Sequence, residues 1–239
     1  MYLKDRGQLL VYSVIDPIVK ILIKINVSPN AITLFGFALN ILAAGVLIWG
    51  AECGERLDHR YVGIFGAIIL FAGLMDMLDG RLAREGNMSS KYGALFDSVI
   101  DRFSELYMFF GICYYLISHD YFFGSIFTFI ALIGSIMVSY TRARAEGLGV
   151  NNSVGFFQRP ERILIVGLSA IVCGVGSMYI DPDFIINVDW FPMPLFETIT
   201  LLTFPIFVLA IGANITAIRR LLNAKTQLER SDSESISKG

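Results

Sequence analysis

Long, predominantly apolar runs separated by short polar segments make up most of the chain. Each run is about as long as one helical crossing of a lipid bilayer requires, which is roughly 20 residues. The polar segments between them contain the Gly, Pro, Asn and Ser residues that typically end helices. We therefore predict an all-α integral membrane protein with six transmembrane helices, at about residues 31–50, 61–77, 92–118, 121–140, 163–179 and 195–218.

The segment before the first run has a different pattern. Up to residue 26, apolar positions alternate with Asp16, Lys20 and Lys24, and Pro17 interrupts the run. This pattern is typical of an amphipathic helix that lies along the membrane surface. We therefore expect a polar N-terminal segment with an interfacial amphipathic helix, a six-helix transmembrane domain, and a polar, disordered cytoplasmic tail. Their predicted bounds are 1–27, 28–222 and 223–239.

Composition and charge agree with this prediction and orient the chain. Hydrophobic residues make up 55% and charged residues only 17%, whereas a soluble domain averages about 25% charged residues. If the N-terminus is cytoplasmic, the outer loops hold only Arg56 and Arg60, and the other 17 of the 19 basic residues lie on the cytoplasmic side. Basic residues favour the cytoplasmic side of a membrane. We expect both termini there, membrane lipids around the helices, and no nucleic-acid partner.

Four aspartates lie within one stretch of the second and third predicted helices. Asp76 and Asp79 are three residues apart, and Asp97 and Asp101 are four apart, so each pair shares a helix face. The short break at 85–91 predicts antiparallel neighbouring helices, with both pairs facing one space near the cytoplasmic surface. Four carboxylates in one space repel each other unless cations neutralise them. Oxygen ligands of this kind suit Mg²⁺, and four of them suit a two-metal site for phosphate displacement.

Two simpler interpretations compete with a catalytic metal site. The aspartates could cap helix ends and pair with Arg81, Arg84 and Arg102. The chain could also be a cation transporter, which is a different class of protein. The acids lie at one membrane edge and no inverted repeat is visible, whereas transporter sites lie near the midplane between repeats. The spacing of the acids, with Gly80 leaving room for a ligand and Arg84 one turn further on, favours a phosphate-handling site.

The pattern Asp76-x2-Asp79-Gly80-x2-Ala83-Arg84-x8-Gly93-x3-Asp97-x3-Asp101 resembles the signature of the CDP-alcohol phosphatidyltransferase family. The segment Ser28-Pro29-Asn30-Ala31-Ile32-Thr33 is similar to the family's sequence before its first span. The resemblance implies transfer of a phosphatidyl group from CDP-diacylglycerol to the hydroxyl of a small alcohol, with release of CMP. It also implies two Mg²⁺ ions, or Mn²⁺ in their place, a homodimer, and the inner (plasma) membrane of a prokaryotic cell with a cytoplasmic active site.

The resemblance also assigns roles to residues. It makes Asp76, Asp79 and Asp97 metal ligands, and Asp101 both a metal ligand and the general base that deprotonates the acceptor hydroxyl. The residues implied to bind the CDP-lipid are Asn30, Ala31, Ile32, Thr33, Asp76, Asp79, Gly80, Ala83, Arg84 and Ser90.

Four arginines near the acids point to an anionic acceptor. Arg142 and Arg144 end the fourth predicted span, and Arg159 and Arg162 begin the fifth. A guanidinium binds phosphate through two hydrogen bonds, although basic residues also flank membrane helices without any ligand. The segments ARAEGLG and RPER together resemble the family branch that makes phosphatidylinositol phosphate from inositol phosphate. Glycerol 3-phosphate is the close alternative, and uncharged inositol or serine is the third.

Overall fold

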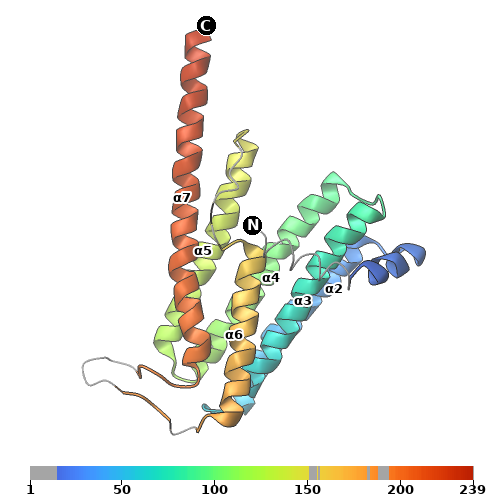
Figure 1. Cartoon of the computed structure of the whole chain (residues 1–239). Coiled ribbons are helices and arrows are strands. Elements are labelled where there is room, and N and C mark those ends of the chain that lie inside the picture. Colours follow the sequence, from blue (N-terminus) through green and yellow to red (C-terminus); the bar gives the residue numbers. More distant parts are fainter. Residues whose placement is uncertain (1–14, 151–154, 156, 182–183, 188–193, 239) are drawn as a thin grey trace.

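The computed structural model describes the whole chain except residues 1–14, 151–154, 156, 182–183, 188–193 and 239 (Figure 1). The described residues are helical apart from turns, loops and one isolated β-bridge between Ile186 and Phe196. Residues 15–24 form a short helix. The main helices are α2 (Pro29–Cys53), α3 (Arg60–Glu85), α4 (Lys91–Ser118), α5 (Phe122–Gly147), α6 (Arg159–Tyr179) and α7 (Thr200–Lys238). The predicted all-α class is therefore confirmed.

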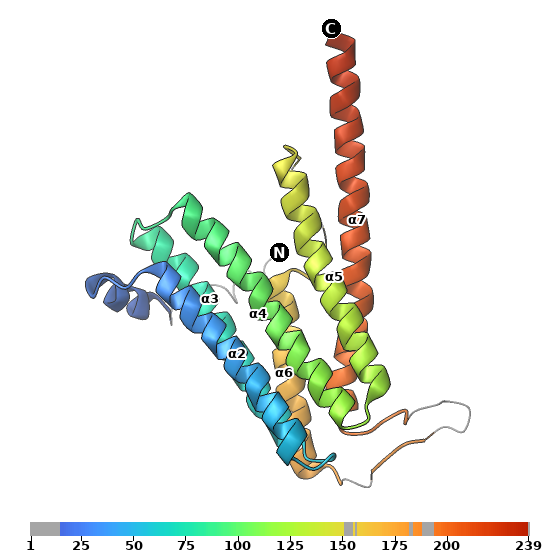
Figure 2. The same ribbon diagram turned by 180° about the vertical axis from the view of Figure 1, so that it is seen from behind.

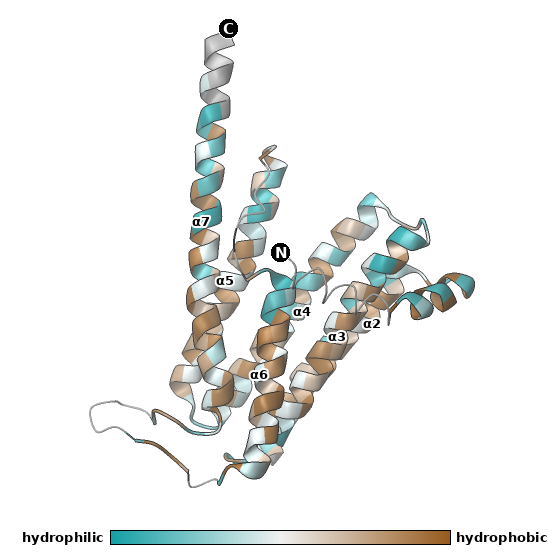
Figure 3. Ribbon diagram, viewed as in Figure 1, coloured by the Kyte–Doolittle hydropathy of each residue, from teal (hydrophilic) through white to brown (hydrophobic). Residues whose placement is uncertain are grey.

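Five of these helices are long and apolar enough to cross a membrane. They are α2, α3, α5, α6 and the Thr200–Arg230 part of α7. Helix α4, the third predicted span, does not qualify because Asp101, Arg102 and Glu105 follow one another closely near its middle. Figure 3 shows hydrophobic residues along the lower parts of the bundle and hydrophilic residues at its upper ends. The five apolar spans agree with an integral membrane protein, whereas the sixth crossing stays a prediction.

The helices form an open bundle with several chain connections gathered at one end (Figures 1 and 2). Helix α2 packs against both α3 and α4, α6 packs against α3 and α7, and α5 packs against α4 and α7. The α3–α4 connection, the end of α5 and the start of α6 all lie toward the upper end in Figure 1. This packing brings α2 and α6, which carry the predicted residues Asn30–Thr33 and Arg159–Arg162, next to the acids of α3 and α4.

Glycines allow α3 and α6 to touch through their backbones. A Cβ atom at Gly66 would lie 2.6 Å from the carbonyl oxygen of Gly167, and one at Gly174 would lie 2.4 Å from Cα of Gly63. Only hydrogen fits at such distances, and small residues of this kind are typical of closely packed membrane helices. The contact fixes α6 against α3 and so places Arg159, the first residue of α6, relative to the upper half of α3.

Polar side chains determine where two of the site-bearing helices begin. The Ser90 hydroxyl accepts a hydrogen bond from the Gly93 backbone N–H at 2.9 Å, which starts α4. The Gln158 backbone N–H donates to Glu161 Oε2 at 3.0 Å, just before α6. Both are helix N-terminal capping contacts. They satisfy backbone groups that the first turn of a helix would otherwise leave unpaired.

The tail beyond the last predicted span is helical. The sequence predicts disorder over residues 223–239, but α7 continues to Lys238. Ala224 is buried together with Ala145 and Val150, so the first turns beyond the predicted span pack against the end of α5. Helices gain most of their stability from such packing. The polar composition of the tail did not indicate this contact.

The short helix at residues 15–24 is anchored to the bundle. Ile15 and Val19 are buried against apolar residues of α2 and α3, whereas Ile18 and Ile21 are 45% and 61% exposed. A second apolar face is therefore left on the outside of the helix. Its predicted position along the membrane surface stays a prediction.

A buried polar network lies at the end of the bundle opposite to the aspartates. His59, just before α3, has its Nδ1 atom 3.0 Å from the Tyr115 hydroxyl. The Tyr121 hydroxyl donates to Glu197 Oε1 at 2.7 Å. Burial lowers the pKa of His59 to about 4, so its ring is neutral at pH 7. The network joins the loops there and lies at the end remote from the aspartates.

Candidate active site

Three aspartates from two helices form a compact cluster. Asp76 of α3 and Asp97 and Asp101 of α4 each offer a carboxylate oxygen, and these oxygens lie within 4.8 Å of one another. Asp97 Oδ1 is buried and has no hydrogen-bond partner in the part of the chain that the structure describes. A buried carboxylate oxygen is costly unless a donor or cation satisfies it. The cluster therefore fits a divalent cation in both charge and ligand type.

Asp79 lies beside this cluster rather than within it. The Asp79 residue is 5% exposed, and its Oδ2 atom accepts a hydrogen bond from the Thr33 hydroxyl at 2.6 Å. Asp79, Asp76 and Asp101 line one narrow space of about 10 Å³, which holds roughly one water-sized species. The predicted convergence of four acids thus takes the form of three clustered carboxylates and a fourth that α2 holds next to them.

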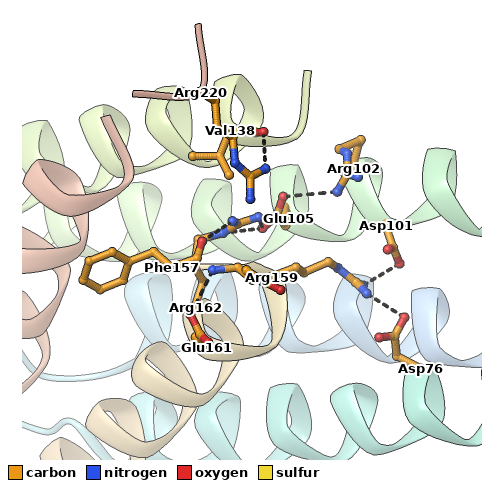
Figure 4. A network of polar contacts seen from close by, with 11 residues as sticks. Asp76, Asp101, Arg102, Glu105, Val138, Phe157, Arg159, Glu161, Arg162 and Arg220 are labelled. Carbon is orange, nitrogen blue, oxygen red and sulfur yellow. Dashed lines mark hydrogen bonds and ion pairs between the residues drawn. The ribbon is translucent and has the colours of Figure 1, made fainter. Parts of the chain in front are cut away.

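Arg159 reaches from α6 into the acidic cluster. Its Nη1 atom lies 2.5 Å from Asp76 Oδ1 and its Nη2 atom 2.7 Å from Asp101 Oδ1. The Arg159 side chain is only 14% exposed, so the two ion pairs are partly shielded from water. Figure 4 shows the guanidinium between the two carboxylates. One arginine therefore links α6 to both α3 and α4 at the site.

Arg162, one turn further along α6, is held inside the protein. Arg162 and Glu105 side chains are each 1% exposed. Arg162 Nε and Nη2 both donate to Glu105 Oε1, the Nε bond at 2.9 Å, and Nη1 donates to the Phe157 carbonyl at 2.7 Å. Arg102 Nη1 lies 3.8 Å from the other Glu105 oxygen. All three guanidinium nitrogens of Arg162 are thus engaged by the protein (Figure 4).

A cavity of about 200 Å³, here called the α2–α4 cavity, opens on one side of the aspartates. Ala31 is exposed and Ile32 is buried against other apolar residues, so neither lines it. Asp76 faces the narrow space instead. The predicted CDP-lipid residues that do line the cavity are Asn30, Thr33, Asp79, Gly80, Ala83, Arg84 and Ser90.

Glycines keep this cavity open to polar groups. A Cβ atom at Gly80 would lie 3.6 Å from Nη1 of Arg84. One at Gly93 would lie 3.0 Å from the Ser90 hydroxyl oxygen and 3.5 Å from Asn30 Oδ1. Residues without side chains therefore stand where the guanidinium, hydroxyl and amide groups converge, which lets a ligand approach the backbone.

A second cavity of about 530 Å³, here called the α4–α6 cavity, opens on the other side. Arg142, Arg159 and Arg162 line it as the sequence predicts. Arg102 and Arg220 also line it and were not predicted. Its acidic lining residues are Asp97, Asp101 and Glu146, so basic side chains outnumber acidic ones among the residues that line it. Such a lining favours an anionic ligand.

Arg144 lies elsewhere. It lines a separate groove between α5 and α7, together with Tyr140, Leu221 and Lys225. Arg142 and Arg144 are two residues apart, and such residues do not share a helix face. Only Arg142 of this pair therefore lines the α4–α6 cavity.

Arg220 is a candidate site residue that sequence reasoning missed. It is 2% exposed, and its Nη1 atom donates to the Val138 carbonyl at 2.8 Å. Arg219 and Arg220 form a basic pair near the end of the last apolar run, which is typical of a membrane-flanking charge. The burial of Arg220 is the observation that indicates a role in the site. This burial results from the packing of α7 against α5, which the sequence does not show.

The two cavities meet at the carboxylates. Asp97 and Ala94 line both of them. Asp101 and Arg159 line both the α4–α6 cavity and the narrow space. Ligands in the two cavities would therefore face each other across the acidic cluster.

Comparisons with known proteins identify the family of the chain. A family model for CDP-alcohol phosphatidyltransferase matches residues 26–203. The archaetidylinositol phosphate synthase of Pyrococcus horikoshii is 35% identical, over 66% of this chain and 76% of its own. The phosphatidylinositol phosphate synthase of Mycobacterium tuberculosis is 29% identical, over 86% of this chain and 82% of its own.

Solved structures of the Mycobacterium tuberculosis phosphatidylinositol phosphate synthase share the fold. The complex with manganese and citrate has a TM-score of 0.68 at 28% identity and covers 88% of each chain. The complex with CDP-DAG has the same TM-score and identity, and covers 89% of this chain and 94% of its own. The resemblance noted from the aspartate motif is confirmed.

Proposed function

Because the chain belongs to the CDP-alcohol phosphatidyltransferase family, we propose that it transfers a phosphatidyl group from CDP-diacylglycerol to a hydroxyl of inositol phosphate, releasing CMP. One observation carries the proposal. A cavity lined by glycines and several polar side chains and an arginine-lined cavity meet at a single cluster of carboxylates. A nucleotide donor and an anionic acceptor can therefore be held on opposite sides of the reacting phosphorus.

The α2–α4 cavity suits the nucleotide and diphosphate of the donor. Arg84 offers a guanidinium beside Gly80, and Asn30 and Ser90 offer neutral hydrogen-bonding groups. A guanidinium pairs well with phosphate oxygens. The solved relative with bound CDP-DAG supports this assignment. Contacts from Ala31 and Ile32 to the CDP-lipid stay predictions, because neither lines the cavity.

The carboxylates are proposed to bind Mg²⁺ or Mn²⁺, with two ions held by Asp76, Asp79, Asp97 and Asp101. The compact cluster, the unpartnered oxygen of Asp97 and the adjoining Asp79 support this ligand set. The solved relative in complex with manganese is a further support. When bound, such cations neutralise the diphosphate and stabilise the CMP leaving group.

Asp101 is proposed as the general base. It faces the α4–α6 cavity, so its carboxylate can accept the proton of an acceptor hydroxyl held there. The freed oxygen forms a bond to the phosphatidyl phosphorus. The bond between that phosphorus and the bridging oxygen of CMP breaks, and CMP leaves with the electron pair.

The charge of the α4–α6 cavity supports a phosphorylated acceptor. Its lining holds five arginines and three acidic residues, and guanidinium groups bind phosphate well, whereas an uncharged acceptor such as inositol or serine would not use them. Glycerol 3-phosphate carries the same phosphate and is the alternative. The proposed binding residues are Arg142, Arg159 and Arg220, with Arg162 supporting the wall.

The proposed membrane arrangement places this site at the cytoplasmic surface. Helix α4 is proposed as a sixth span, supported by the exposed apolar side chains of Phe103, Leu106 and Phe110. Residues 15–24 would lie along the membrane, with their exposed isoleucines toward lipid. The basic residues favour cytoplasmic termini. The family further suggests a homodimer in the inner membrane of a prokaryotic cell.

The test is CMP release by the purified full chain. With CDP-diacylglycerol and Mg²⁺ or Mn²⁺, we expect CMP and a new lipid when inositol phosphate is added, and a loss of both when EDTA removes the cation. Glycerol 3-phosphate, inositol and serine are supplied in parallel, and the product lipids are identified by mass. Absence of CMP with every acceptor would reject the transferase, and ion flux in vesicles would then favour a transporter.

Arg220→Gln tests the acceptor assignment. We expect the KM for inositol phosphate to rise about 10- to 100-fold, because a charge-assisted hydrogen bond is worth roughly 1.5–3 kcal/mol. The KM for CDP-diacylglycerol should stay near the wild-type value, because Arg220 does not line the α2–α4 cavity. Arg219→Gln, which removes the neighbouring exposed charge, is the matched control. Equal increases in both KM values for Arg220→Gln would contradict the assignment.

A further inference from the structure

The arginines of the α4–α6 cavity differ in the protein groups that their guanidinium groups contact. Arg162 is locked by Glu105 and the Phe157 carbonyl through all its guanidinium nitrogens. Arg142 is 48% exposed and pairs with Glu146 on its own helix. Arg159 alone among the described arginines contacts two of the clustered carboxylates, Asp76 and Asp101.

Arg159 is also incompletely satisfied. Its Nε atom is buried and has no hydrogen-bond partner among the residues that the structure describes. A guanidinium has five N–H donors in a fixed fork, so this group keeps a donor for another acceptor. Arg159 lines the α4–α6 cavity as well as the narrow space at the carboxylates. The same side chain can therefore serve either an anion in the cavity or the carboxylates.

On the basis of the function given above, we propose that Arg159 is a shared positioning residue that couples cation binding to acceptor binding. The guanidinium and a divalent cation compete for Asp76 Oδ1 and Asp101 Oδ1. Cation binding therefore turns Arg159 toward the α4–α6 cavity, where it meets the acceptor's phosphate. Conversely, an oxyanion in that cavity draws Arg159 away and leaves the carboxylates to the cation.

This competition has a thermodynamic consequence that is independent of turnover. The cation and the oxyanion must each increase the affinity of the other by the same factor. The competition also distinguishes Arg159 from an arginine that only binds phosphate. Substitution of Arg159 should strengthen cation binding, whereas substitution of a simple phosphate ligand should not. A donor lipid in the α2–α4 cavity is not needed for either effect.

The experiment measures Mn²⁺ binding to the purified full-length protein in detergent, by the loss of the free-Mn²⁺ EPR signal. Sulfate is the oxyanion probe, and chloride at equal ionic strength is its control. For the wild type, we expect sulfate to tighten Mn²⁺ binding by about fivefold or more, the lower end of typical coupling. Arg159→Gln should bind Mn²⁺ about tenfold more tightly than wild type without sulfate, and sulfate should have no further effect.

Two variants separate the proposed competition from a general effect of charge. Arg142→Gln removes a cation from the same cavity that does not contact Asp76 or Asp101, and it should keep wild-type Mn²⁺ affinity without sulfate. Arg159→Lys keeps the charge but cannot bridge two carboxylates as a guanidinium does, so it should also bind Mn²⁺ more tightly. Wild-type affinity in both Arg159 variants, or equal tightening in Arg142→Gln, would overturn the proposal.

The outcome is distinguishable from a failure of the proposed reaction. Coupled Mn²⁺ and sulfate binding without CMP release would keep the role of Arg159 and reject the transferase. CMP release with Mn²⁺ affinity that depends on neither sulfate nor Arg159 would reject the coupling alone. Failure to bind Mn²⁺ under any condition would reject both.

Discussion

Replacing Asp101 with asparagine is expected to lower the rate of CMP release by about 10²- to 10⁴-fold, the usual contribution of a positioned general base. Asparagine has nearly the same shape but cannot accept the proton of the acceptor hydroxyl. The measurement is kcat at saturating Mn²⁺, inositol phosphate and CDP-diacylglycerol. Saturating cation separates the loss of the base from a weakened metal site.

The donor should still bind to this variant, because Asp101 does not line the α2–α4 cavity. Asp58→Asn is the matched control, since Asp58 pairs with Arg60 at the opposite end of the bundle. We expect that variant to keep wild-type turnover. If Asp101→Asn also kept it, the base would have to be another group.

The second large effect concerns stability. Removing one member of the buried Arg162–Glu105 pair, by Glu105→Ala or Arg162→Met, should cost about 3–5 kcal/mol because it leaves a buried charge without its partner. Replacing both residues, as Glu105→Leu with Arg162→Met, should recover most of that loss. The measurement is the free energy of unfolding in detergent, from denaturant titrations of the full chain.

An exposed pair provides the comparison. Arg142→Gln breaks the ion pair with Glu146, in which both side chains are nearly half exposed, and should change stability by no more than about 1 kcal/mol. If the double variant were as unstable as the single variants, the pair would contribute more than mutual neutralisation. Single variants as stable as wild type would mean that water reaches Glu105.

Much of the site was predictable because it depends on helix geometry. The spacing of Asp76, Asp97 and Asp101, together with the short α3–α4 connection, was enough to bring their carboxylates together. The position of Asp79 was harder to predict from the sequence, because it depends on a hydrogen bond from Thr33 on α2. Local spacing determines which face a residue lies on, but it does not determine which helix packs against that face.

The remaining differences have the same physical origin. Arg159 contacts Asp76 across 83 positions of the sequence, and no local pattern encodes that distance. Arg144 and Arg220 resemble flanking charges in sequence, and their different surroundings follow from the packing of α5 against α7. The helical tail after residue 222 likewise depends on Ala224 meeting Ala145.

The glycines at which α3 and α6 touch set the shortest possible distance between these two helices beside the active site. The two backbones are already at contact distance near Gly66 and Gly167, so these helices cannot move closer together. The distance between the backbones that carry Arg159 and Asp76 therefore has a lower limit. Adaptation to a larger or smaller acceptor would have to come from the walls that α4, α5 and α7 supply, and engineering of acceptor choice is best directed at those walls.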